Sequence, residues 1–164
     1  MNFYTSSTFR KCLEDLLKKR KDGYSSVSAD ICKALHDMPD NILRGTNERI
    51  IQTPNFRIVK LRVPNSGQRL SKSDGFRLIY IVSMVSDDLA LLRVFPKRGA
   101  KGMVNISDAE YMRLIKEVMT ESNDRKLHQV DITNMMEEIS TDGSLTSIRS
   151  NTSFPRFLFW PRWR

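Results

Sequence analysis

The sequence predicts an α+β domain in which helices cover one face of a small antiparallel sheet. Three observations indicate this class. Apolar residues recur at helical spacing over the first 38 residues, extended apolar runs follow between residues 56 and 95, and a capped helix begins near residue 107. The length of 164 residues suits a single core of ordinary size. No apolar stretch approaches the roughly 18 residues of a membrane span, so we expect none.

The N-terminal region is predicted to hold a short strand and a helical hairpin. Residues 2–5 form an extended segment, and Ser6 or Ser7 can cap a helix over about 8–21. A second helix is expected over about 26–38, and the two helices should form an antiparallel hairpin on the sheet. Their expected core residues are Phe9, Leu13, Leu16, Leu17, Val27, Ile31, Ala34, Leu35 and Met38.

Three strands and a helix are expected in the middle of the chain. The strands span 56–63, 75–82 and 89–95, and the second is apolar on both faces, which indicates a central position. The serine and glutamate of Ser107-Asp108-Ala109-Glu110 can satisfy each other's backbone donors in a capping box. The helix that follows should turn Tyr111, Leu114, Ile115 and Val118 inward.

A change of composition divides the chain at residue 119. We expect a domain over 1–119 and an extension over 120–164 on which the functional site does not depend. Ile132, Met135, Met136 and Ile139 are expected to dock as a short helix. Residues 140–153, rich in Ser, Thr, Asn and Gly, are expected to be mobile, and the aromatic residues of the last eleven positions to touch the domain or a partner.

The excess of positive over negative charge is confined to one stretch of the chain. The whole chain carries 27 basic and 19 acidic residues, a net charge of +8. Residues 44–101 alone carry 12 basic and 4 acidic residues, so they hold the entire excess. A charge excess of this kind indicates a polyanion site, and nucleic acid is favoured over an acidic protein.

Cysteine and histidine usage excludes several kinds of site. Cys12 and Cys32 fall in apolar helical patterns without CxxC spacing, which indicates reduced thiols of a cytosolic protein. His36 and His128 are the only histidines, too few for a histidine-based triad or a zinc site. We therefore expect no metal and no small-molecule cofactor.

Seven cations of the basic stretch are expected to converge at one end of the sheet. They belong to the first strand, to the loop that follows it, to the start of the second strand and to the end of the third. The candidate catalytic residues are Lys60, Arg77, Lys97 and Arg98, and the candidate RNA-binding residues are Arg62, Arg69 and Lys72.

A basic site can cleave RNA without histidine, because RNA carries its own nucleophile in the ribose 2′-hydroxyl. Crowded positive charges lower the pKa of a lysine, which can then act as general base. Guanidinium groups stabilise the negative charge of the pentavalent phosphorane. The same residues could instead form a passive binding patch, and the residue pattern alone leaves both open.

Four segments, taken in order, form a distinctive pattern. They are Lys60-Leu61-Arg62, KSDGFRLIY from Lys72 to Tyr80, LLRVFPK from Leu91 to Lys97, and ISDAE from Ile106 to Glu110. This set resembles the RelE/ParE toxin superfamily, and the GFRLIY strand is its most specific part. The N-terminal FYTSSTFRKCLEDLLKK is similar to the first strand and helix of that family. The resemblance covers about residues 1–119.

The resemblance implies a RelE-like fold and a type II toxin that cleaves messenger RNA, usually on the ribosome. It also implies an antitoxin protein as the neutralising partner. Members with a basic site have a lysine at the position of Lys60, an arginine at Arg77 and a basic residue after the last strand, here Lys97 or Arg98. We therefore expect a metal-independent endoribonuclease of the cytoplasm.

Two positions depart from that pattern, and two other functions stay open. Ribonuclease members have a further lysine where this chain has Ile58. Their late tyrosine has its nearest match in Tyr111, whose helical core pattern indicates a structural role. A gyrase-inhibiting branch of the same superfamily binds a protein and often lacks the basic cleft, so the charge over 44–101 favours the ribonuclease branch. The other alternative is an inactive nucleic-acid-binding module.

Overall fold

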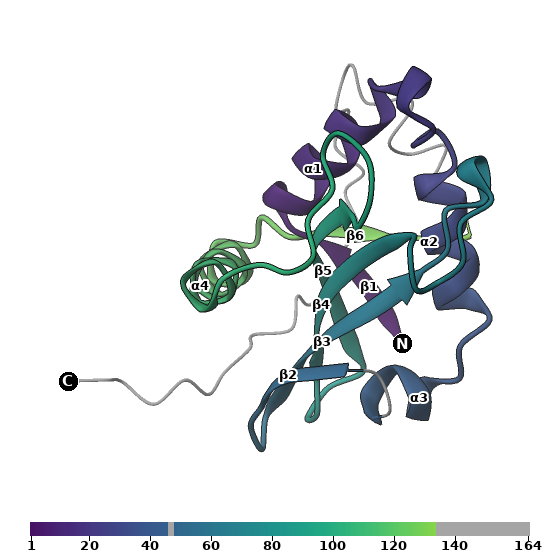
Figure 1. The fold of residues 1–164 in the computed structure, drawn as a ribbon. Coiled ribbons are helices and arrows are strands. Elements are labelled where there is room, and N and C mark those ends of the chain that lie inside the picture. The colour runs from purple at the N-terminus through teal and green to yellow at the C-terminus, as the bar shows by residue number, and fades with distance from the viewer. Residues whose placement is uncertain (46–47, 134–164) are drawn as a thin grey trace.

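The computed structural model describes residues 1–45 and 48–133. Helices and strands alternate irregularly along the chain (Figure 1). Their order is β1 (Asn2–Thr5), α1 (Ser7–Leu17), η1 (Arg20–Asp22), α2 (Val27–His36), α3 (Asp40–Gly45), β2 (Glu48–Gln52), β3 (Phe56–Val63), η2 (Ser66–Gln68), β4 (Phe76–Ser83), β5 (Asp88–Pro96), α4 (Asp108–Asn123) and β6 (His128–Val130). The fold class is α+β, as predicted, and none of the described helices is long and apolar enough to span a membrane.

The six strands form one mixed sheet in the order β2-β3-β4-β5-β1-β6. β1 pairs parallel to β5, and the other neighbours pair antiparallel. The prediction of a wholly antiparallel sheet is therefore wrong at β1. Three helices and three strands separate β1 from β5 in the chain, and a connection of that length allows parallel pairing, which a short turn does not.

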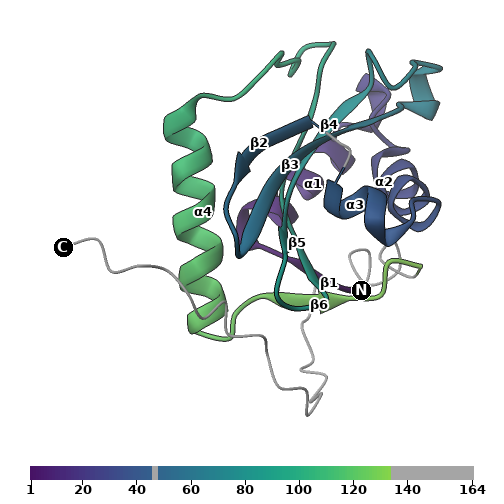
Figure 2. The same ribbon diagram turned by 90° about the horizontal axis from the view of Figure 1, so that it is seen from below.

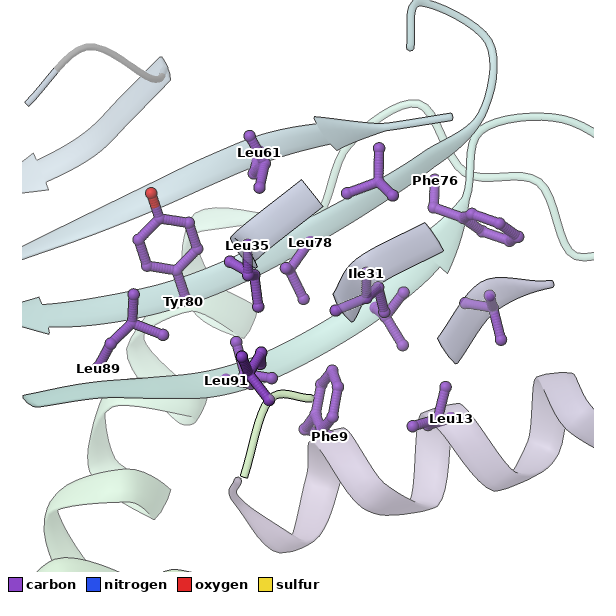
Figure 3. Close-up of a cluster of buried hydrophobic side chains, with 14 of the residues drawn as sticks. Phe9, Leu13, Ile31, Leu35, Leu61, Phe76, Leu78, Tyr80, Leu89 and Leu91 are labelled. Atoms are coloured by element: carbon purple, nitrogen blue, oxygen red, sulfur yellow. The ribbon is translucent and has the colours of Figure 1, made fainter. Parts of the chain in front are cut away.

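Helices cover both faces of the sheet, with α4 on one side and α2 and α3 on the other (Figure 2). The hairpin prediction is confirmed in that α1 and α2 pack with the sheet in one buried cluster, in which Phe9, Leu13 and Ile31 face the strands (Figure 3). The prediction that one face alone is covered is wrong. Because β4 is buried along its whole length, its second face also needs a cover, and α4 supplies it.

The inward residues predicted for α4 are buried in a second cluster with the opposite face of the sheet. Tyr111, Leu114, Ile115 and Val118 are each at most 4% exposed. The strands predicted at 56–63, 75–82 and 89–95 agree with β3, β4 and β5 to within one residue. The sequence did not predict α3, β2 or β6, all of which are six residues or shorter.

Two carboxylates of α4 hold the N-terminus of α1. The hydroxyl of Ser6 accepts a hydrogen bond from the Phe9 amide, as expected of an N-cap. In addition, the Thr8 amide donates to Glu117 Oε1 over 2.9 Å, and the Ser7 amide donates to Glu121 Oε2 over 3.1 Å. Negative charge at this position is favourable, because the N-terminus of a helix is its positive end. The end of α4 is thereby fixed to the start of α1.

The division expected at residue 119 falls inside α4, which ends at Asn123. β6 then pairs with β1, and Leu127 and Ile132 are buried against the domain. Residues 120–133 are therefore part of the sheet-and-helix structure. The remaining predictions for the extension, the helix with Met135, Met136 and Ile139, the mobile segment and the aromatic end, lie outside the described residues.

Gly75, directly before β4, packs closely against the backbone at the end of β3. A Cβ atom at this position would lie 2.2 Å from the Val63 carbonyl oxygen and 2.7 Å from the Asn65 nitrogen. Both are backbone atoms of the neighbouring strand end, so they cannot move without displacing the strand. The Gly75 carbonyl also accepts a hydrogen bond from the Lys97 amide, which joins this point to β5.

We expect Gly75→Ala to lower the free energy of unfolding by about 2 kcal/mol or more, because it forces two paired strands apart. Gly67→Ala is the matched control, since its new Cβ would first meet the hydroxyl of Ser26 at 3.0 Å, a side chain that can move. Urea denaturation of both variants measures the two losses. Equal losses of unfolding free energy in the two variants would show that the close packing at Gly75 does not make this position more sensitive than Gly67.

Glu121→Ala is expected to cost about 1–2 kcal/mol of unfolding free energy, because it removes the acceptor of the Ser7 amide. Glu14→Ala serves as the control, since Glu14 forms only an exposed pair with Lys18 on α1, worth about 0.5 kcal/mol or less. Thermal and urea unfolding compare the two. A loss at Glu121 no larger than that at Glu14 would contradict the capping role.

Candidate functional site

The pairing of β3 with β4 places three predicted cations on one face of the sheet. Arg62 on β3 lies directly opposite Arg77 on β4, and Lys60, two residues earlier, lies opposite Ile79. Residues opposite each other in an antiparallel pair share a face and lie about 5 Å apart at Cβ. Ile79 belongs to the apolar cluster with α4, so this is the face that α4 covers. We call Lys60, Arg62 and Arg77 the sheet-face cluster.

The sheet-face cluster is mostly buried. Lys60 is 8% exposed and Arg77 is 5% exposed, whereas Arg62 is exposed. Like charges directly opposite each other in a sheet are destabilising, and buried cations lose hydration. Arg62 and Arg77 are therefore a like-charged pair across β3 and β4, whereas Lys60 has Glu48 of β2 opposite it in the register.

Arg77 binds the backbone of the loop between β3 and β4. Its Nη1 donates to the carbonyl oxygens of Lys72 over 3.2 Å and Phe76 over 3.1 Å, and its Nη2 donates to the Ser73 carbonyl over 2.7 Å. These acceptors are neutral, so the three bonds orient the guanidinium without neutralising it. They also fix the segment 72–74 beside the strand end.

Asp74 gathers the two cations that follow β5. Lys97 Nζ donates to the Ser73 carbonyl over 2.9 Å and forms an ion pair with Asp74 Oδ1 over 3.2 Å. Arg98 Nε donates to the same carboxylate oxygen over 2.9 Å. The hydrogen bonds from Arg98 and Lys97 lower the pKa of Asp74 below its usual value. Asp74 was not among the predicted site residues; its position as the one acid of the loop over 64–75 was the available signal.

The structure places four of the seven predicted residues at one end of the sheet, one in the middle of β3 and two on the connecting loop. Arg77, Lys97 and Arg98 contact residues 72–74 at the ends of β4 and β5, and Arg62 lies opposite Arg77 near the end of β3. Lys60 lies farther from this end, in the middle of β3. The side chain of Lys72 is exposed on that loop. Arg69 is also exposed but lies at the end of η2, in the part of the loop that packs on α2 through Ser26 and Asp30.

A further arginine lies on the same face of the sheet and was not predicted. Arg93 on β5 is opposite Ile79, and it forms an ion pair with Glu110 at the start of α4. Glu110 also pairs with Arg113, and the hydrogen bonds and charges of the two arginines lower the pKa of this carboxyl. The signal in the sequence was a charged residue inside an apolar strand.

The capping box predicted at the start of α4 forms only in part. Ser107 Oγ accepts a hydrogen bond from the Glu110 amide over 3.2 Å. The Glu110 carboxylate binds the two arginines instead of the backbone, because guanidinium groups are stronger partners than an amide. Tyr111 is 4% exposed, and its hydroxyl bonds with Asn105 over 3.3 Å, which agrees with the structural role expected for it.

Other features of the described residues lie apart from these cations. An open hollow of about 540 Å³ on α4 has charged walls of both signs and contains none of the predicted site residues; it is lined by Arg113, Lys116, Glu117, Thr120, Glu121, Asp124 and Lys126. Over 1–45 and 48–133, no three His, Cys, Asp or Glu residues are grouped so that they could hold a metal ion. Cys12 and Cys32 are free and partly buried, and burial raises the pKa of Cys32 to about 11.

No family model matches the chain, and neither a curated protein nor a solved structure matches it. Function must therefore be argued from the site itself and from the sequence motifs. The feature that stands out is a set of cations on three neighbouring strands, of which Arg77, Lys97 and Arg98 are held by backbone carbonyls and by the carboxylate of Asp74.

Asp74→Asn is expected to destabilise the protein at neutral pH and to have little effect in acid. A carboxyl whose pKa is lowered by folding stabilises the folded state above its unfolded pKa of about 3.8, and this contribution is lost as the pH falls through the lower, folded value. Thermal unfolding of wild type and variant between pH 2.5 and 7 measures the difference. A difference in Tm that is constant over this range would contradict the ion pairs with Lys97 and Arg98.

Proposed function

We propose that the protein binds messenger RNA at the sheet-face cluster and cleaves it, as a RelE-like toxin that an antitoxin protein neutralises. The observation that carries the proposal is Arg62 opposite Arg77, with Lys60 next to them on the same face. Like charges directly opposite each other repel, and a phosphate bound between the two guanidinium groups would offset that repulsion. The resemblance of the four ordered segments to the RelE/ParE superfamily supports the same function.

The proposed reaction uses the ribose as nucleophile. Lys60 takes the proton of the 2′-hydroxyl, whose oxygen attacks the adjacent phosphorus. The bond from phosphorus to the 5′-oxygen breaks, and that oxygen takes up a proton from water. The products are a 2′,3′-cyclic phosphate and a 5′-hydroxyl.

The arginines and Lys97 have different parts in this reaction. Arg77 stabilises the negative charge of the phosphorane with a guanidinium that backbone carbonyls hold in a fixed orientation. Lys97 and Arg98 are held by Asp74 at the neighbouring strand end, and either can face a further phosphate oxygen once RNA competes with Asp74. Arg62, Arg69 and Lys72 bind the RNA backbone from exposed positions.

One observation favours a second candidate, an RNA-binding module without catalysis. Arg77 is used to hold the loop backbone, and Lys97 and Arg98 are already paired with Asp74. Such contacts would suit cations whose role is to shape a binding surface. RNA retention without cleavage is the result that this alternative predicts.

Lys60→Arg is expected to retain RNA binding and to lose cleavage by about a hundredfold, because arginine keeps the charge but does not release a proton in the working range. Arg62→Ala should weaken binding. Lys116→Ala is the control, an exposed cation on α4 outside the cluster. Purified protein is incubated with ribosomes and message, and the cleavage ends are mapped at several pH values.

The outcomes separate the candidate functions. Cuts that are lost in Lys60→Arg but kept in Lys116→Ala support the proposed reaction. Full activity of Lys60→Arg with an unchanged pH profile would remove Lys60 as the base. Retention of RNA without cuts by the wild type supports the binding module, and inhibition of gyrase without either result would place the protein with the gyrase-inhibiting toxins.

A further inference from the structure

Three connections meet at one end of the sheet (Figure 1). They are residues 18–26 between α1 and α2, residues 64–75 between β3 and β4, and residues 96–102 after β5; we call them the loop end. The Gln68 side chain donates to the Asp22 carbonyl over 2.7 Å, and the Tyr24 hydroxyl donates to the Arg98 carbonyl over 3.3 Å. With the bonds of Lys97 to residues 73–75, these contacts join the three connections into one surface.

The loop end carries nearly all of the net charge of the protein. Its residues include nine of the 27 basic residues and two of the 19 acidic ones, a net charge of +7 out of +8. The side chains of Lys19, Lys21, Arg69, Lys72 and Lys101 are exposed and form no ion pair within the described part of the chain. Of the two acids, Asp74 is already paired with Lys97 and Arg98.

The exposed Lys19, Lys21 and Lys101 are not needed to hold the connections together. Apart from the contacts of Lys97 and Arg98 with residues 73–75, neutral groups do that: Asn65 is 1% exposed and accepts a hydrogen bond from the Gln68 amide over 3.1 Å, and Ser26 accepts one from the Gly67 amide over 2.9 Å. The exposed lysines therefore add repulsion without adding internal contacts. Such a surface is favourable when a polyanion supplies the opposite charge.

The kind of polyanion follows from what the loop end lacks. Proteins that bind single strands stack bases on exposed aromatic side chains. Here Tyr24 and Phe76 are fully buried and packed edge to face, with ring centroids 6.1 Å apart. Protein interfaces need several apolar anchors. Among the described residues in or next to these connections, Val104 is the single large apolar side chain that is strongly exposed. Charge without stacking or apolar anchors suits a surface that touches phosphates alone.

We propose that the loop end binds the phosphate backbone of a nucleic-acid duplex through Lys19, Lys21 and Lys101, the exposed cations that the proposed cleavage does not use. This goes beyond the proposed cleavage, because it needs no single-stranded substrate and no chemistry. It gives the protein two surfaces: the sheet-face cluster for a single strand and the loop end for a paired region, which makes contacts independent of sequence.

The test compares two triple variants of the full chain. Lys19→Ala/Lys21→Ala/Lys101→Ala removes one set of exposed cations from the loop end. Lys11→Ala/Lys33→Ala/Lys116→Ala removes three exposed lysines from α1, α2 and α4 and is the matched control for charge. Affinity for a fluorescent 20-base-pair RNA duplex, a DNA duplex of the same length and an unstructured single strand is measured at several salt concentrations, with circular dichroism to verify folding.

The loop-end variant should bind duplex at least about tenfold more weakly, with a salt slope smaller by about 2 to 3, because each lost phosphate contact releases one counterion fewer. The control should stay within about twofold of wild type. The duplex that binds more tightly, RNA or DNA, shows which nucleic acid the loop end recognises. Equal losses in both variants, an unchanged slope, or binding of polyglutamate as tight as that of duplex would overturn the proposal. Cleavage of the single strand is scored separately, so either proposal can fail alone.

Discussion

The register in which β3, β4 and β5 pair is the constraint on which the candidate site depends. Because side chains alternate between faces, a slip of one residue would turn Lys60, Arg62 and Arg77 into the apolar cluster of α1 and α2. The same register places the end of β5 beside the loop before β4, where the Lys97 amide binds the Gly75 carbonyl. The strand ends lie so close together at Gly75 that a side chain at this position would have no room.

Neutral and charged side chains have different roles in this arrangement. Asn65, Ser26 and Gln68 fix the connecting loops by hydrogen bonds, and backbone carbonyls orient Arg77. The cations of the connecting loops, such as Lys19, Lys21 and Lys101, are thus left at the surface. A rigid base with outward cations is what a phosphate-binding surface requires, because little order has to be created on binding.

The sequence was sufficient for elements with a strong local pattern, and it was weaker where distant segments decide the structure. The alternation over 56–63 predicted β3 to the residue, and helical spacing predicted the buried faces of α1, α2 and α4. Parallel pairing of β1 with β5 has no local signal, and neither has the use of both sheet faces. In the site, the positions of the cations followed from strand order, but Asp74 as partner of Lys97 and Arg98, and Glu110 as partner of Arg93, depend on contacts between loops and layers.

The central claim is that the sheet-face cluster promotes attack by the ribose 2′-hydroxyl. The most direct measurement uses a cleavable RNA in which the single nucleotide before the mapped cut is replaced by its 2′-deoxy form. We expect the unmodified RNA to yield a 2′,3′-cyclic phosphate and a 5′-hydroxyl, and the substituted RNA to remain intact at that position. Cleavage of the 2′-deoxy substrate at the same bond, or products that end in a 3′-hydroxyl, would contradict the account.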